Sequence, residues 1–157
     1  MADPNFEDVL NKKPSVIEKP KPRPLGTYLG GIEKFELREV NTKNGQRKLI
    51  EFSVKLMAPI QVDRQEDLME QGDIGDWYPL QYSIFYETPE GQYNLKRFLS
   101  DTLGVDPGEG RNEKTIGQMV AESPGRQLAA TLRHEPYQDR NTGEPEIATR
   151  IGSVAKV

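Results

Sequence analysis

Residues 42–56, TKNGQRKLIEFSVKL, decide the fold predicted for this chain, because they join a tight turn to a strand with one apolar face. The dipeptide Asn44-Gly45 is a strong signal for a short β-hairpin turn. After the turn, apolar and polar residues alternate with the period of a half-buried strand, and the apolar positions are Ile50, Phe52, Val54 and Leu56. We therefore expect a hairpin whose returning strand, ended by Pro59, packs one face into a core.

The segment before this turn, residues 27–40, is expected to be the partner strand. Its apolar residues change parity after Gly30-Gly31, since Tyr28 and Ile32 share one parity whereas Phe35 and Leu37 share the other. A glycine pair combined with a change of parity is typical of a bulged and strongly bent strand.

A third strand is expected over residues 77–88, WYPLQYSIFYET, which are rich in aromatic side chains. Between the second and third strands, the acidic residues 63–72 are expected to form a short helix capped by Asp63. Within the third strand, Leu80, Tyr82 and Ile84 share one face, and Trp77 and Phe85 share the other. Leu80 and Ile84 are the aliphatic residues, so their face is expected to point into the core.

The period changes after Pro89, where Leu95, Phe98, Leu99 and Leu103 follow a helical spacing that ends at Gly104. Thr115 is expected to cap a second short helix. Two further strands are expected over residues 126–134 and 146–154, joined by a turn at residues 141–143.

This order of elements predicts a mostly β fold, namely a five-stranded OB-like barrel with one or two helices between strands 3 and 4. A β-sandwich or another small barrel remains open at this point. We expect the barrel over residues 25–157, preceded by a flexible, proline-rich arm over residues 1–24. The predicted core consists of Ile50, Phe52, Val54, Leu80, Ile84, Leu128, Leu132 and Ile147.

The composition argues against an enzyme. The chain has 157 residues, a formal net charge of −4, no cysteine and one histidine, His134, so neither a thiolate nucleophile nor a zinc ligand set is present. We expect no catalytic residue, no metal site and no cofactor. No apolar run reaches the length of a membrane span, and a cytoplasmic protein without a membrane partner is expected. Residues 63–76 carry six acids and one arginine, so an anionic partner on another face is not excluded.

Basic and aromatic residues gather where an OB-like barrel binds nucleic acid. Such barrels use strands 2 and 3 and the neighbouring loops, and single strands need cations along the backbone and rings on which bases stack. Strand parity favours Trp77 and Phe85 as the stacking rings. The full set of predicted nucleic-acid-binding residues is Arg38, Lys43, Arg47, Lys48, Lys55, Trp77, Tyr82, Phe85, Arg133 and Arg150.

Five short motifs give the chain, over residues 24–155, a resemblance to a known family. The motifs are Pro24-Leu25-Gly26-Thr27-Tyr28, Lys43-Asn44-Gly45, Glu51-Phe52, Leu95 with Phe98-Leu99, and Gly125-Arg126-Gln127-Leu128. In these the chain resembles a family of small phage proteins described as single-stranded DNA-binding or OB-like. The resemblance implies a barrel that binds single-stranded DNA.

Two functions follow as expectations. The first is a phage-type protein that binds single-stranded DNA without chemistry in replication or recombination, in the host cytoplasm, with replication or recombination proteins as further partners. The alternative is a phage virion or assembly protein whose arm contacts neighbouring subunits. The sequence leaves open whether the chain forms a homo-oligomer.

Overall fold

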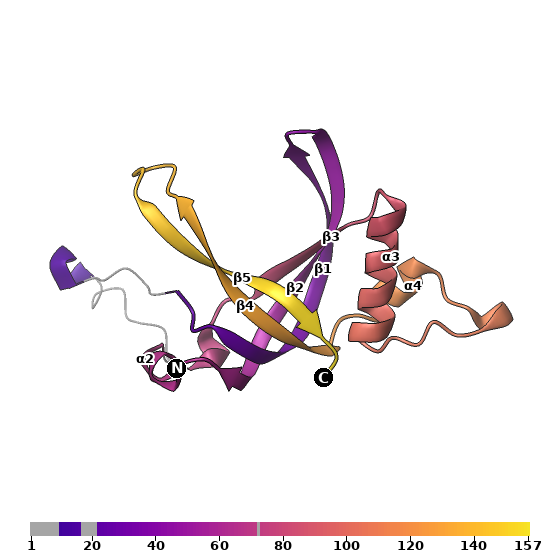
Figure 1. Cartoon of the computed structure of the whole chain (residues 1–157), viewed down its shortest axis with the longest axis horizontal. Helices are drawn as coiled ribbons and strands as arrows, with labels where there is room; N and C mark the ends of the chain where they lie inside the picture. The colour runs from indigo at the N-terminus through magenta and orange to yellow at the C-terminus, as the bar shows by residue number, and fades with distance from the viewer. Residues whose placement is uncertain (1–9, 17–21, 72) are drawn as a thin grey trace.

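The computed structural model describes residues 10–16, 22–71 and 73–157. Within them, five strands form one antiparallel sheet in the order β3-β2-β1-β4-β5 (Figure 1). The strands are β1 (Gly26–Thr42), β2 (Gly45–Val62), β3 (Leu80–Phe85), β4 (Gln127–Gln138) and β5 (Pro145–Ala155). This mostly β architecture confirms the predicted OB-like fold class, although the sheet is not closed, because β3 and β5 are both edge strands.

The helices lie between the strands as predicted. Helix α3 (Pro89–Arg97), its π-helical continuation (Phe98–Thr102) and α4 (Ile116–Ala121) separate β3 from β4, and α2 (Gln65–Glu70) separates β2 from β3. Thr88 caps α3 by accepting a hydrogen bond from the Gly91 backbone N–H. Short 3-10 turns occupy Pro14–Val16, Ile74–Asp76 and Gly110–Asn112.

Strand β1 is bent, which allows it to pair with β2 along its length and with β4 over Thr27–Gly31. Its register against β2 shifts at three points, one of them between Ile32 and Lys34, which confirms the predicted bulge. A Cβ at Gly30 would lie 2.7 Å from Cγ1 of Val54, so the close approach of β1 to the core side of β2 requires glycine there.

The core lies between the concave side of the sheet and α3. The four alternating residues of β2 are at most 1% exposed, and the Phe52 ring lies 4.8 Å from that of Phe98. Two predicted core residues differ: Leu80 is only half-buried, and Ile147 is 52% exposed. Ile147 lies opposite Pro136, beyond the register shift at Thr131 and Leu132, where β4 and β5 extend past the core.

Several local predictions were wrong. Strand β2 continues past Pro59 to Val62, because Pro59 lies beside a register shift, where a missing N–H is tolerated. Helix α2 begins after Arg64 without a side-chain cap, instead of after Asp63. The hairpin predicted from Asn44-Gly45 is present, with Lys43-Asn44 as the turn residues and Gly45 as the first residue of β2, at a φ of +105°.

The largest error concerns Trp77. Strand β3 begins only at Leu80, so strand parity does not extend back to Trp77. Trp77 instead follows a 3-10 turn and packs into the core, with its ring 5.7 Å from that of Tyr28 in an edge-to-face arrangement. The prediction that Trp77 points away from the core is therefore wrong.

Most of the predicted arm, residues 1–24, lies outside the described residues, but its last residues contact the barrel. The Arg23 guanidinium lies over the Trp77 ring at 5.2 Å and donates a 2.6 Å hydrogen bond to the carbonyl of Tyr78. The Arg23 backbone N–H donates to Oγ1 of Thr149, and its carbonyl lies 2.7 Å from Nε2 of His134. Burial lowers the pKa of Arg23. These contacts join the end of the arm to β4 and β5.

Ionisation of the Tyr28 hydroxyl makes the unfolding free energy depend on pH in the alkaline range. Its hydroxyl donates a 2.7 Å hydrogen bond to the carbonyl of Pro24, and burial, with a smaller contribution from Asp63, raises the pKa of Tyr28 to about 12. Because the unfolded chain releases this proton near pH 10, the stabilisation is complete below that pH and is lost as pH rises towards 12. We expect Tyr28→Phe to cost about 1 kcal/mol at neutral pH.

Urea unfolding at several pH values tests this expectation. Between about pH 10 and pH 12, the wild-type unfolding free energy should fall more steeply with pH than that of Tyr28→Phe. Parallel curves for the two proteins would show that Tyr28 ionises as easily in the folded state as in the unfolded state.

Candidate nucleic-acid interface

Two long hairpins project beyond the core. Figure 1 shows the tips of the β1–β2 and β4–β5 hairpins diverging on one side of the molecule, with α2 at the opposite end. In the first hairpin, nearly all of residues 33–48 are exposed. In OB-type barrels, the loops at these two positions flank the face that binds oligonucleotides.

Strands β1, β2 and β3 together present an outward face, on the side of the sheet opposite the core positions of β2. This surface is here called the β2–β3 face. Side chains alternate along strands, so the residues opposite the core positions of β2, together with their cross-strand partners, share it. The face carries four bases and two acids. Its members are Gly31, Lys34, Glu36, Arg38, Val40, Arg47, Leu49, Glu51, Ser53, Lys55, Gln81, Ser83 and Phe85.

Phe85 is the ring of this face. It is half-buried at the end of β3, and the Arg47 guanidinium lies 4.7 Å from its ring centroid. Leu49 pairs with both Arg38 and Phe85 and is 5% exposed, so it forms an apolar floor between them. A ring with an arginine on its face offers both stacking and charge to a nucleotide.

The bases of the hairpin are balanced by acids of the same region. Arg38 is 2.8 Å from Glu51, Arg47 is 3.9 Å from Glu87, and Lys48 is 3.9 Å from Glu39. Exposed pairs of this kind contribute little to stability, so a phosphate can replace the carboxylate at small cost. Lys43, in the turn, forms no ion pair with any described residue.

The structure divides the predicted site residues into groups. Arg38, Arg47, Lys55 and Phe85 share the β2–β3 face, although the Lys55 ammonium donates to the carbonyl of Trp77. Lys48 points to the opposite side of β2, because it follows Arg47 directly. Trp77 is in the core and is unable to offer its ring to a base without unfolding.

The β4–β5 hairpin carries the remaining two predicted bases. Arg133 and Arg150 are cross-strand partners, and both lie near Glu135, at 3.6 Å and 3.5 Å. One carboxylate serves two guanidinium groups, so this patch keeps a net positive charge. Among the described residues, no other base of the predicted site lies on the β4–β5 hairpin.

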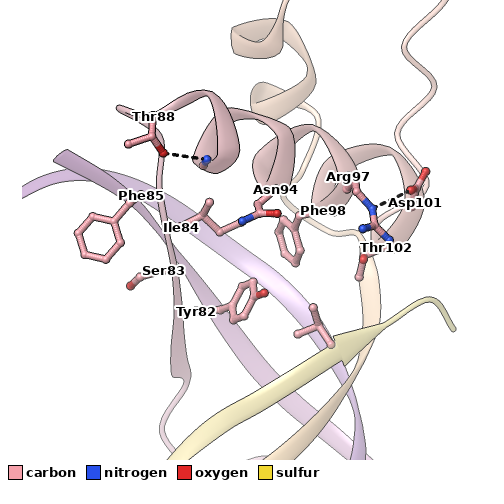
Figure 2. A pocket seen from close by; sticks show the side chains of 12 residues that line it. Tyr82, Ser83, Ile84, Phe85, Thr88, Asn94, Arg97, Phe98, Asp101 and Thr102 are labelled. Carbon is pink, nitrogen blue, oxygen red and sulfur yellow. Dashed lines mark hydrogen bonds and ion pairs between the residues drawn. The ribbon is translucent and has the colours of Figure 1, made fainter. Parts of the chain in front are cut away.

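Sequence reasoning missed a cavity of about 500 Å³ at the open side of the barrel. It lies where β3, α3 and the end of β5 meet, and Tyr82 lines it together with residues of α3 (Figure 2). Burial raises the pKa of the Tyr82 hydroxyl. The helical spacing of Asn94, Arg97 and Asp101 places them on one side of α3 and its π-helical continuation, but no sequence signal showed that this side faces an unpaired strand edge.

Two other kinds of feature are absent from the described residues. No group of three or more histidine or acidic side chains there is arranged to hold a metal ion. No helix in that part of the chain is long and apolar enough to cross a membrane.

Comparison with known proteins finds similarity among solved structures. No family model and no curated protein matches the sequence. A solved structure of yeast RPA bound to ssDNA is similar over 100% of this chain and 89% of that chain, with 6% sequence identity and a TM-score of 0.37. At this low TM-score, the fold assignment rests on strand order and register.

Proposed function

We propose that the protein binds single-stranded DNA, without catalysis, on the β2–β3 face. The observation that carries this proposal is the placement of Arg47 on the ring of Phe85, at the outward end of β3 and beside Arg38. Single-strand binding needs a ring for a base and cations for the adjacent phosphates, and this cluster supplies both.

The strand would run across β2 and β3 between the two hairpins. Arg38 and Arg47 would exchange their carboxylate partners for phosphates, and the Arg133–Arg150 patch would extend the track on the second hairpin. We propose phage replication or recombination, in the host cytoplasm, as the setting. Proteins of those processes would be further partners.

A salt titration tests the electrostatic half of this proposal. Each phosphate contact on a single strand contributes roughly −0.7 to the slope of log affinity against log salt. The double variant Arg38→Ala, Arg47→Ala should therefore bind labelled oligo-dT more weakly and flatten the slope by about 1–1.5 units. The slope is obtained from fluorescence anisotropy at several salt concentrations.

The matched control is Lys48→Ala, Lys96→Ala, which removes the same charge from the opposite side of β2 and from α3. This control should retain most of the wild-type slope. Equal slopes for the two double variants would show that the net charge, and not the β2–β3 face, governs binding. Absence of binding by the wild type even at low salt would contradict the proposed function.

A further inference from the structure

We propose that the cavity between β3, α3 and β5 receives one nucleobase of the bound strand. The inference rests on the proposed function, but it assigns a second site that the β2–β3 face does not contain. The residues that carry it are Tyr82, Asn94, Arg97, Phe98 and Thr102.

The cavity exists because the barrel is open on this side. Strand β3 pairs only with β2 in the sheet, and β5 pairs only with β4, so the seam between them holds no ladder. Helix α3 and the π-helical turn stand over the seam, and Val154 of β5 also lines the cavity. The volume of about 500 Å³ is ample for one planar base, and the cavity opens to solvent.

The walls suit a flat heteroaromatic ring. The ring centroids of Tyr82 and Phe98 are 5.0 Å apart, with an angle of 37° between the ring planes. Both residues line the cavity (Figure 2). Phe98 is nearly fully buried and holds its position, whereas Tyr82 is half-buried and offers ring surface to the cavity. Stacking against such rings is tolerant of base identity, because every base has a π-face.

A polar group that lacks a protein partner lines the same space. The side chain of Asn94 forms no hydrogen bond with any described residue, and it projects from α3 into the cavity (Figure 2). An amide both donates and accepts, as the edge of a base requires. The charged groups, Arg97 and Asp101, lie 3.7 Å apart and balance each other, which favours a neutral base over a phosphate.

The cavity adjoins the β2–β3 face, along which the bound strand is proposed to run. Phe85 and Ser83 line its edge and also belong to the β2–β3 face. In Figure 2 the Phe85 ring lies on one side of β3 and the Tyr82 ring on the other. A nucleotide next to the one stacked on Phe85 can therefore turn over the free edge of β3 and place its base in the cavity.

An abasic scan tests the inference with the full chain. A dT oligomer is shortened to the minimum length that still binds, and a single abasic residue is placed at each position in turn. Wild type should show two sensitive positions, each losing about 5- to 150-fold in affinity. Asn94→Trp, which fills the cavity, should bind more weakly and lose sensitivity at one of them, while Phe85→Ala loses sensitivity at the other.

Gln92→Trp is the matched control, since Gln92 is an exposed residue of α3 that does not line the cavity, and it should retain both sensitive positions. Asn94→Leu keeps the number and branching of the side-chain heavy atoms and removes the amide, so it should reduce affinity several-fold even if Asn94→Trp folds poorly. Thermal melts accompany each variant.

Three outcomes would overturn the inference. If wild type binds the strand but Asn94→Trp shows the wild-type affinity and abasic profile, the base does not enter the cavity, while the proposed function stands. If only the position assigned to Phe85 is sensitive, the face acts alone and the cavity belongs to another ligand, such as a peptide added to the β3 edge. If wild type binds no strand, both proposals fall.

Discussion

Replacing Phe52 with alanine is expected to lower the unfolding free energy by about 3–5 kcal/mol. Phe52 is fully buried on the core face of β2, and its ring contacts that of Phe98, so the change leaves a void between the sheet and the π-helical turn. Since domains of this size are stable by only about 5–15 kcal/mol, the variant should melt far below wild type. Urea or thermal unfolding followed by circular dichroism measures the loss.

Phe35→Ala is the matched control for this prediction. Phe35 is the cross-strand partner of Phe52 on β1 but is 36% exposed. Its loss should cost under about 2 kcal/mol, since less apolar surface returns to water. Similar losses for the two variants would mean that the hairpin is packed along its whole length.

Replacing Phe85 with alanine is expected to weaken binding to oligo-dT by about 5- to 150-fold, because base stacking on an aromatic ring is worth about 1–3 kcal/mol. The ring also supports Arg47 at 4.7 Å, so its removal frees the guanidinium as well. Fluorescence anisotropy with a labelled oligomer at low salt gives the affinity. The slope against salt should change little, because no charge is removed.

Phe35→Ala again supplies the comparison, since it removes a partly exposed phenylalanine from the opposite side of the sheet. This variant should bind the oligomer as wild type does. Wild-type affinity in Phe85→Ala would rule out an aromatic platform on β3 and leave binding to charge alone.

Much of the fold could be predicted from local patterns. The alternation at residues 50–56, the change of parity after Gly30-Gly31 and the helical spacing from Leu95 to Leu103 each appear in the structure as expected. These signals are reliable because a strand or helix with one apolar face must bury that face, whatever the rest of the chain does. The order of such elements then indicated the OB-like fold.

The candidate site depended on pairing and on element boundaries. Charge and aromatic content placed Arg38, Arg47 and Phe85 among the candidates, and the structure brings these three together. Trp77 entered the same set only because β3 was expected to begin three residues too early. Strand parity predicts the direction of a side chain only within a strand. It therefore could not predict that Trp77, which precedes β3, is buried under Arg23.

The sequence by itself determined which residues alternate, where the chain turns and which side chains are candidates for contact with a single strand. The tertiary structure alone decided which of these side chains share a face, that Lys48 is separated from Arg47, and that a cavity lies between β3, α3 and β5. The reason is physical: local patterns set the conformation of each element, whereas a face or a cavity is made by elements distant in the chain, whose register and closure depend on the packing of the whole core.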